Sequence, residues 1–182
     1  YCYNYKGKLI DQLTYGEWEV DEVFGLFDDE VYFSSTEGNI FGRNIYKTNL
    51  EGSKKIIVSL KGCNSVQVSP DGEFLVNHNS SFQVPDNYNV LDSEGSFIRE
   101  LESNEELYYR TKSVDLPIPE YFVYENSNGD SLNAYFLKPV DFDSTKKYPV
   151  LLYAYGGPGF QVLKNEYDGF NYFWHTHLTE KG

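Results

Sequence analysis

The sequence predicts a mostly β chain in which four-stranded blades are followed by the start of an α/β domain. Three observations lead to this prediction. The 182 residues include 17 Tyr, 13 Phe and 2 Trp, and aromatic side chains favour pleated, half-buried surfaces. A 43-residue shift superimposes several features of residues 23–52 on residues 66–95. An apolar run at residues 149–155 then departs from the alternating pattern before it.

The repeat has the length and element order of a propeller blade. Val23 superimposes on Val66, and the Glu-Gly pair at 51–52 superimposes on the pair at 94–95. Each unit contains four short strands separated by acidic turns, and about 40–50 residues per four strands is the spacing of a β-propeller blade. Two units cannot close a ring, and residues 3–10 are typical of the closing hairpin of another blade. We therefore expect an internal fragment that at least one more blade precedes.

A domain boundary is predicted where the repeat stops. The blade pattern ends after about Leu107, and Pro117 and Pro119 follow it. Proline removes a backbone donor and fixes φ, so two prolines in three residues favour a linker over a further strand. We predict the C-terminal blades of a propeller in residues 1–111 and a second domain in residues 112–182.

The second domain begins with a hairpin and continues with a different kind of strand. Turn-forming residues 126–130 separate the aromatic-rich runs 121–124 and 132–137, which predicts a hairpin. Residues 149–155 are apolar on both faces, as in a strand buried within an α/β sheet. The aromatic pattern of residues 166–179 predicts a helix.

Tyr155 is the candidate catalytic residue. It ends the apolar run and precedes the Gly-Gly-Pro-Gly sequence at 156–159. In α/β-hydrolases the loop after an early strand carries half of the oxyanion hole, and glycines there let the backbone approach the reacting carbonyl. A tyrosine hydroxyl aimed at developing negative charge contributes about 3–4 kcal/mol if it acts as other such donors do. The alternative is a buried strand ending in a Gly-Pro turn, with Tyr155 as packing.

The combined pattern resembles the dipeptidyl peptidase IV branch of the prolyl oligopeptidase (S9) serine peptidases. The resemblance is carried by residues 12–20 (QLTYGEWEV), residues 42–47 (GRNIYK) and residues 142–159, in matching order and spacing. It implies the final blades of a β-propeller followed by the start of an α/β-hydrolase domain. It also implies a serine exopeptidase that removes N-terminal dipeptides after Pro or Ala, with Tyr155 in the oxyanion hole.

The resemblance also implies which catalytic groups this chain lacks. The triad would run Ser, Asp, His in sequence order, all C-terminal to residue 182. No Gly-x-Ser-x-Gly occurs in the chain, and Ser53 lacks the second glycine and the buried strand of a nucleophile elbow, so we expect Ser53 in a turn. The fragment alone should be inactive. An alternative is a catalytically dead relative that serves as a binding or channel-associated subunit, and a third reading is a propeller interaction module.

Partners and location follow partly from charge and partly from the resemblance. Fifteen Lys and Arg against 28 Asp and Glu give a net charge of −13, so we expect no nucleic-acid partner, because that affinity depends on cations at phosphates. The family implies peptide substrates, a homodimer and no cofactor or metal. No run of about 18 apolar residues occurs, so any membrane anchor lies outside this chain. A membrane-anchored extracellular or secreted location is expected, with a cytoplasmic or periplasmic one as the alternative.

Other polar groups have simpler interpretations than catalysis. His175 and His177 suggest a metal pair only weakly, because residues two apart on a helix point about 200° apart. His78 is expected to be an exposed loop histidine. Acidic side chains that could form the paired carboxylates of a glycosidase alternate with Trp18 and Val20 and predict a solvated strand edge; they are Glu17, Glu19, Asp21 and Glu22, with Asp28, Asp29 and Glu30 in the next turn.

Cys63 and Asn79 are relevant to whether the protein is secreted. Secreted relatives have a disulfide cysteine at the place of Cys63, but its expected partner is absent from residues 76–79. We expect Cys63 to be free and buried, with pairing to Cys2 or to a group outside the fragment as the alternatives. The sequon Asn79-Ser80-Ser81 marks a glycoprotein only if the protein is secreted.

Overall fold

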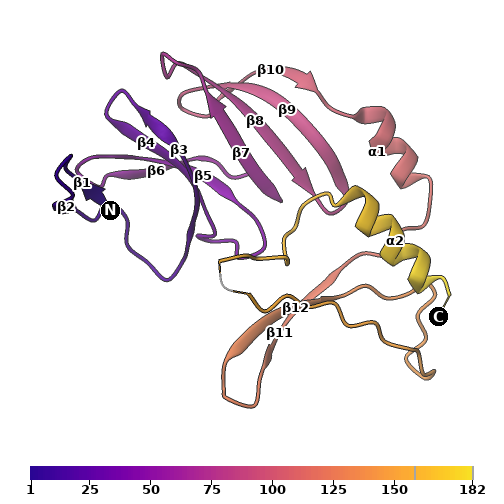
Figure 1. Ribbon diagram of the computed structural model, residues 1–182. Helices are drawn as coiled ribbons and strands as arrows, with labels where there is room; N and C mark the ends of the chain where they lie inside the picture. Colours follow the sequence, from indigo (N-terminus) through magenta and orange to yellow (C-terminus); the bar gives the residue numbers. More distant parts are fainter. Residues whose placement is uncertain (158, 182) are drawn as a thin grey trace.

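The chain forms two four-stranded sheets, a short hairpin before them, and a second hairpin with two helices after them (Figure 1). The structure is a computed structural model that describes residues 1–157 and 159–181. Its elements in chain order are β1 (Cys2–Tyr3), β2 (Leu9–Asp11), β3 (Val20–Phe27), β4 (Glu30–Ser35), β5 (Asn44–Asn49), β6 (Lys54–Val58), β7 (Cys63–Val68), β8 (Phe74–Ser81), β9 (Val84–Asp92), β10 (Phe97–Glu102), α1 (Glu105–Lys112), β11 (Glu120–Glu125), β12 (Ser131–Phe136) and α2 (Gly169–Thr179).

The two four-stranded sheets are the predicted blades. Blade 1 has the order β3-β4-β5-β6 and blade 2 the order β7-β8-β9-β10, and both are antiparallel meanders. Their first strands begin at Val20 and Cys63, and their last strands begin at Lys54 and Phe97, so the 43-residue repeat holds at both ends. The β1–β2 hairpin also forms as predicted. The strands described here do not close a ring.

The hydrophobic core lies between the two blades. Successive side chains of a strand point to opposite faces of the sheet, so apolar side chains two residues apart lie on the same face. Burying each such side chain contributes about 1.5–3 kcal/mol. The buried set comprises Tyr32, Ile45, Ile57 and Val58 from blade 1 with Val66, Leu75 and Leu91 from blade 2.

A polar contact joins the blades at the turn between β9 and β10. Lys47 of blade 1 lies 2.7 Å from the carboxylate of Glu30 and 2.6 Å from that of Glu94 in this turn. Glu94 also pairs with Lys55. Hydrogen bonds from both lysines, assisted by their charges, outweigh the effect of burial and lower the pKa of Glu94 to about 2. Gly95 follows at φ 84°, where a Cβ would lie 1.9 Å from the Ile57 carbonyl oxygen, so the turn packs directly on blade 1.

The hairpin and the C-terminal helix after the blades agree with the prediction, and one helix was not predicted. β11 and β12 pair in register from Glu120–Phe136 to Glu125–Ser131, which confirms the hairpin. α2 confirms the predicted C-terminal helix and begins at Gly169. α1 was not predicted, and all but its last residue falls within residues 1–111, which were assigned to the blades. It begins after Asn104, a favoured N-cap residue, and has Glu105 and Glu106 in its first turn, which are typical of a helix start. Asn104 has a φ of 50° and makes no side-chain cap.

The predicted buried strand at residues 149–155 is wrong in this structure. The segment belongs to no sheet, and Val150 and Leu152 are 83% and 84% exposed. A strand within a parallel sheet needs hydrogen-bonding neighbours on both edges and covering elements on both faces. None of the strands described here pairs with this segment, so its apolar pattern has nothing to pack into.

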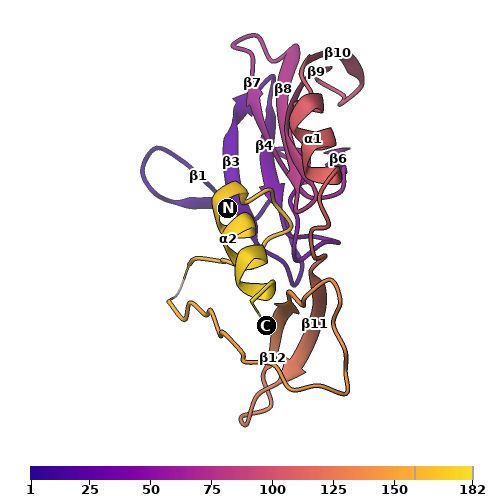
Figure 2. The ribbon, with the colours of Figure 1, turned by 90° about the vertical axis from the view of Figure 1, so that its right-hand side faces the viewer.

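Two views place the later elements relative to the blades. α2 lies between the lower end of blade 2 and the β11–β12 hairpin in Figures 1 and 2, and the hydroxyl of Tyr172 in α2 donates to the Pro117 carbonyl at 3.2 Å.

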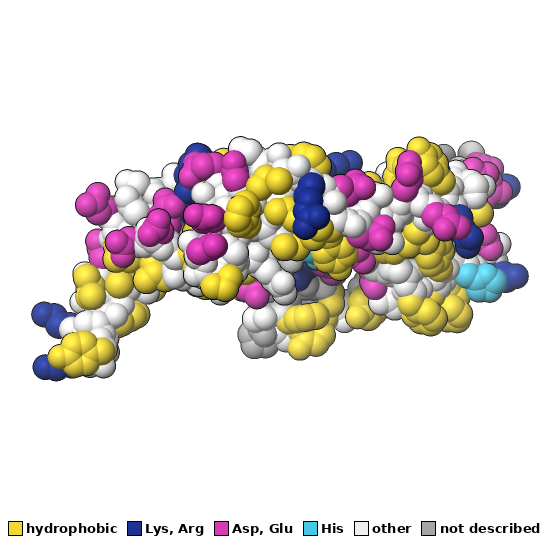
Figure 3. Space-filling view, turned by 90° about the horizontal axis from the view of Figure 1, so that it is seen from above, with side chains coloured by type: hydrophobic (Ala, Val, Ile, Leu, Met, Phe, Trp, Pro, Cys, Tyr) yellow, Lys and Arg dark blue, Asp and Glu magenta, His cyan; other side chains and the backbone are white. Residues whose placement is uncertain are grey.

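Acidic side chains are scattered over the face in Figure 3, with few basic ones between them, as the net charge of −13 requires. Among the described helices, neither has the length and apolar character needed to cross a bilayer.

Candidate functional site

Tyr155 lies at the end of the exposed apolar segment. Its side chain is 55% exposed, and its hydroxyl makes no hydrogen bond to the part of the chain that the structure describes. The ring packs edge-on against Phe160, with 5.3 Å between the centroids. The hydroxyl is therefore available to an outside acceptor, which is what an oxyanion donor requires. The catalytic role of Tyr155 stays a prediction.

Gly157 leaves the space that the Tyr155 ring occupies. A Cβ on Gly157 would lie 2.6 Å from the Tyr155 hydroxyl and 2.8 Å from two ring carbons. Any larger residue would have to displace the ring, because these distances are far inside van der Waals contact. Pro158 of the predicted Gly-Gly-Pro-Gly turn lies outside the described residues.

The chain after this turn is attached to both blades through hydrogen bonds. The blade partners come from the β4–β5 connection and from the end of β8 with its connection to β9, which are equivalent places in the two blades. The contacts are Gln161 Nε2 to Ile40 O (2.9 Å), Asn165 N to Phe41 O (2.5 Å), Phe82 N to Asn165 Oδ1 (3.0 Å) and Tyr167 N to Ser80 Oγ (3.2 Å).

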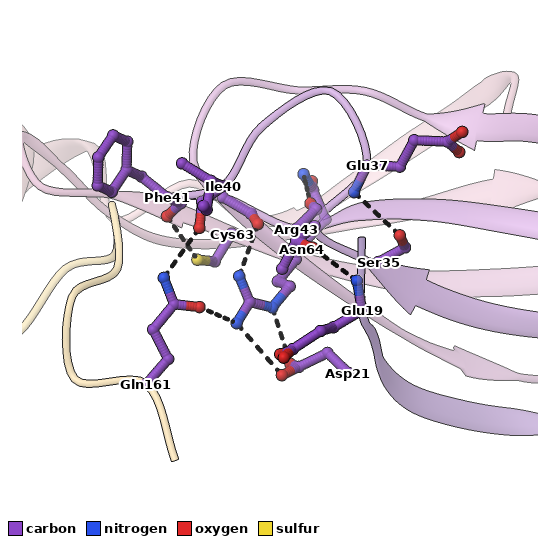
Figure 4. Close-up of polar contacts among 12 residues, drawn as sticks. Glu19, Asp21, Ser35, Glu37, Ile40, Phe41, Arg43, Cys63, Asn64 and Gln161 are labelled. Carbon is purple, nitrogen blue, oxygen red and sulfur yellow. Dashed lines mark hydrogen bonds and ion pairs between the residues drawn. The ribbon is translucent and has the colours of Figure 1, made fainter. Parts of the chain in front are cut away.

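Arg43 is the charged group at this attachment (Figure 4). Its Nη1 donates to the Gly42 carbonyl at 2.8 Å, and its Nη2 donates to Asp21 Oδ1 at 3.2 Å and to Gln161 Oε1 at 2.8 Å. Arg43 Nε lies 3.0 Å from Asp21 Oδ2 but is not aligned for a hydrogen bond. Burial would raise the pKa of Asp21, but the Arg43 hydrogen bond and charge, with the charge of Lys164, hold it below its usual range. Asp21 is therefore ionised at neutral pH.

An aromatic cluster lies beside these hydrogen bonds. Phe41 packs on Tyr121 with centroids 4.5 Å apart, and Phe82 packs on Tyr172 at 4.4 Å and on Tyr135 at 5.9 Å. The two phenylalanines come from the equivalent blade connections, and the tyrosines come from the later hairpin and α2. Burial raises the pKa of Tyr121 and of Tyr172 to about 12. Both hydroxyls therefore stay protonated at neutral pH, and that of Tyr172 donates to the Pro117 carbonyl.

The acidic residues of the first blade form no catalytic pair. Asp21, predicted to lie on a solvated edge, instead pairs with buried Arg43, because the β4–β5 connection brings Arg43 beside β3. Glu30 pairs with Lys47. Trp18, which alternates with the acidic residues, stacks on Phe33 with centroids 6.4 Å apart.

The histidines and Ser53 contact groups other than the Tyr155 hydroxyl in the described chain. His175 packs near Tyr153, and His177 lies 3.7 Å from Glu180, so the two rings do not converge. Within residues 1–157 and 159–181, no group of three His, Cys, Asp or Glu side chains could hold a metal ion. His78 is in β8 and not in a loop; its Nε2 lies 2.7 Å from Asp86 Oδ1. Ser53 lies in the turn between β5 and β6, as predicted.

Cys63 and Asn79 are both packed into blade 2. Cys63 is a free thiol whose pKa burial raises to about 11, and Cys2 is free as well. Asn79 is only 7% exposed, and its Nδ2 donates to the carbonyls of Lys61 and Cys63 and to Asn64 Oδ1. This fold leaves no room for a glycan on Asn79, since the nitrogen that would carry it is already enclosed.

A cavity of about 600 Å³ opens elsewhere, between the N-terminal segment and blade 1. Its walls are mostly apolar and include Leu13, Trp18, Val31 and Phe33. None of the described residues between 149 and 167 lines it, so it is separate from Tyr155.

Comparison with known proteins defines the class of this fold. The crystal structure of Porphyromonas gingivalis dipeptidyl peptidase 4 superimposes with a TM-score of 0.90 and 30% identity, over 99% of this chain and 26% of that chain. A putative dipeptidyl aminopeptidase IV from Bacteroides ovatus gives a TM-score of 0.72 at 27% identity, over 94% of this chain and 25% of that chain. The two sheets are thus blades of the dipeptidyl peptidase β-propeller.

Sequence comparison gives the same family. Residues 1–86 match the family described as dipeptidyl peptidase IV (DPP IV) N-terminal region. A probable dipeptidyl-aminopeptidase B of Metarhizium robertsii is 30% identical over 85% of this chain and 18% of its own length. A probable dipeptidyl peptidase 4 of Emericella nidulans is 28% identical over 94% of this chain and 23% of its own length. These comparisons support a fragment of the dipeptidyl peptidase IV type of the S9 family, and the chain spans about a fifth of the length of these relatives.

Proposed function

We propose that this chain is part of a serine dipeptidyl peptidase that removes N-terminal dipeptides after Pro or Ala. The observation that carries the proposal is that Tyr155 is exposed beside the space that Gly157 leaves, with its hydroxyl bonded to no group in residues 1–157 and 159–181. The similarity to dipeptidyl peptidases over nearly the whole chain supports it. The pair Tyr155 and Gly157 favours an active peptidase over a catalytically dead subunit, because a dead relative has no need of an oxyanion donor.

In this proposal the chain contributes two parts of the enzyme. Residues 1–111 form C-terminal propeller blades, and residues 112–182 begin an α/β-hydrolase domain. A serine would attack the peptide carbonyl, a histidine would accept its proton, and an aspartate would orient the histidine. Tyr155 would donate to the oxyanion. The 182 residues contain no Gly-x-Ser-x-Gly, so this part alone should be inactive.

The remaining parts of the proposal rest on the family resemblance. It favours a homodimer and a secreted or membrane-anchored extracellular protein, with any anchor outside this chain. The enclosed Asn79 and the free Cys63 give that location no support, so a cytoplasmic or periplasmic enzyme stays the alternative. Size-exclusion chromatography with light scattering and cell fractionation of the full-length protein test these points.

The decisive experiment is Tyr155→Phe in the full-length protein. Loss of one oxyanion donor should lower kcat about 10²–10³-fold on a Pro- or Ala-containing dipeptide substrate while KM changes little. Tyr153→Phe, two residues earlier and 70% exposed, is the matched control and should retain activity. An unchanged kcat in Tyr155→Phe removes Tyr155 from the mechanism. A full-length wild-type protein that folds but has no peptidase activity favours the dead subunit.

A further inference from the structure

The guanidinium of Arg43 links a propeller blade to the chain that follows Tyr155. Arg43 is only 3% exposed and directly precedes β5. Its charge is balanced within the blade by Asp21 of β3. One of its hydrogen bonds nevertheless leaves the blade and ends on Gln161, 118 residues further along the chain. A buried cation needs its hydrogen bonds filled, and here a neutral amide from another region fills one of them.

Both polar atoms of the Gln161 side chain make hydrogen bonds. Its Oε1 accepts from Arg43 at 2.8 Å, and its Nε2 donates to the carbonyls of Ile40 at 2.9 Å and Leu163 at 2.8 Å. An amide with both ends bonded cannot rotate without breaking hydrogen bonds, so the backbone at this position is fixed relative to blade 1 (Figure 4).

Gln161 directly follows Phe160, whose ring packs against the ring of Tyr155. Phe160 precedes Gln161 and contacts the Tyr155 ring edge-on at 5.3 Å. Tyr155 is otherwise exposed, and no hydrogen bond orients its hydroxyl within the described chain. The contacts therefore run in order from Asp21 to Arg43, Gln161, Phe160 and Tyr155.

We propose that Arg43, acting through Gln161, is a positioning residue that sets the Tyr155 hydroxyl relative to the propeller. This inference rests on the proposed function of Tyr155 as an oxyanion donor. A misplacement of about 1 Å at a reacting group can cost about 10²-fold in rate, so a contact of this kind can control catalysis without touching substrate. Arg43 would thus couple the propeller to the catalytic domain.

The test is a double-mutant cycle in the full-length enzyme. Arg43 is too deeply buried for a clean substitution, so the change is made at Gln161. Gln161→Ala should lower kcat about 10-fold and leave KM within about twofold, because the loss is one of positioning. In a Tyr155→Phe background the same change should have no further effect on kcat, because Gln161 acts through Tyr155.

A further variant separates positioning from general attachment. Asn165→Ala removes another hydrogen bond to the blades, to the Phe82 N–H, without touching Arg43, and should retain kcat. Equal losses in Gln161→Ala and Asn165→Ala would overturn the inference.

The outcomes distinguish this inference from the proposed function. If Tyr155→Phe lowers kcat but Gln161→Ala does not, the proposed function stands and the positioning role falls. If Tyr155→Phe leaves kcat unchanged, the proposed function falls, and hydrogen exchange of the full-length protein decides whether the contact orders the segment. Amides of Gly156, Gly157 and Phe160 should exchange faster in Gln161→Ala than in Asn165→Ala, and equal rates would overturn the ordering role as well.

Discussion

The two blades and the segment at residues 149–167 differ in what holds them in place and in whether their apolar side chains are buried. In the blades each strand pairs with the next across a short connection, so each sheet forms among neighbours in sequence, and a core lies between the two blades. Residues 149–155 have the most continuous apolar run in the chain, yet their side chains stay exposed. The chain beyond them is fixed by side-chain hydrogen bonds to the blades. An antiparallel meander supplies its own partners, whereas a central parallel strand depends on distant ones.

The largest effect expected from this difference concerns two leucines. Leu75 is 0% exposed in the core between the blades, and Leu152 lies in the exposed segment. Leu75→Ala should lower the free energy of unfolding by about 2–5 kcal/mol, because it leaves a cavity. Leu152→Ala should change it by less than about 0.5 kcal/mol. Urea denaturation followed by circular dichroism measures both, and a similar cost at the two positions would show that residues 149–155 are packed after all.

A smaller effect is expected from the polar contact that joins the blades. Lys47→Ala leaves Glu30 and Glu94 without their shared partner and should lower the free energy of unfolding by about 1–3 kcal/mol. Lys138→Ala, which removes an exposed pair with Glu120 in the β11–β12 hairpin, is the matched control and should cost about 0.2–1 kcal/mol. Denaturation midpoints of the two variants rank them, and an equal cost would mean that Lys47 does not join the blades.

The blades could be predicted because their signals are local. Period-2 alternation and acidic turns repeat after 43 residues, and the strands beginning at Val20 and Cys63 follow them. The same local rules failed at residues 149–155, where burial depends on partners that the pattern does not specify. They also failed at α1, whose eight residues are too few to show a helical period, although Asn104, Glu105 and Glu106 are typical of a helix start.

The contacts around the candidate site could be predicted only in part. Tyr155 stood out because glycines follow it, and the space beside Gly157 agrees with that reading. Nothing in the sequence marks Arg43 as buried or pairs it with Asp21 or Gln161. That pairing arises from tertiary contacts 22 and 118 residues apart, and only a structure brings such groups together.

The smallest expected effect is the response of the blade contact to acid. Lys47 and Lys55 hold the pKa of Glu94 at about 2, below its ordinary value of 4.5. Since the folded-state pKa is the lower one, this contact stabilises the fold fully above about pH 4.5 and loses that contribution as the pH falls toward 2. Glu94 is half exposed, so solvent screens the effect, and it should weaken further in about 1 M salt.

Glu94→Gln tests this assignment. The variant should be less stable than the parent at neutral pH and should lose less of its stability between about pH 4.5 and pH 2.5, because it has no carboxylate to protonate. Glu120→Gln in the exposed hairpin is the control and should keep the profile of the parent. Urea midpoints across this range give the three curves. If Glu94→Gln is as acid-sensitive as the parent, the acid response belongs to other carboxylates, and the inter-blade contact is no stronger than the pair in the hairpin.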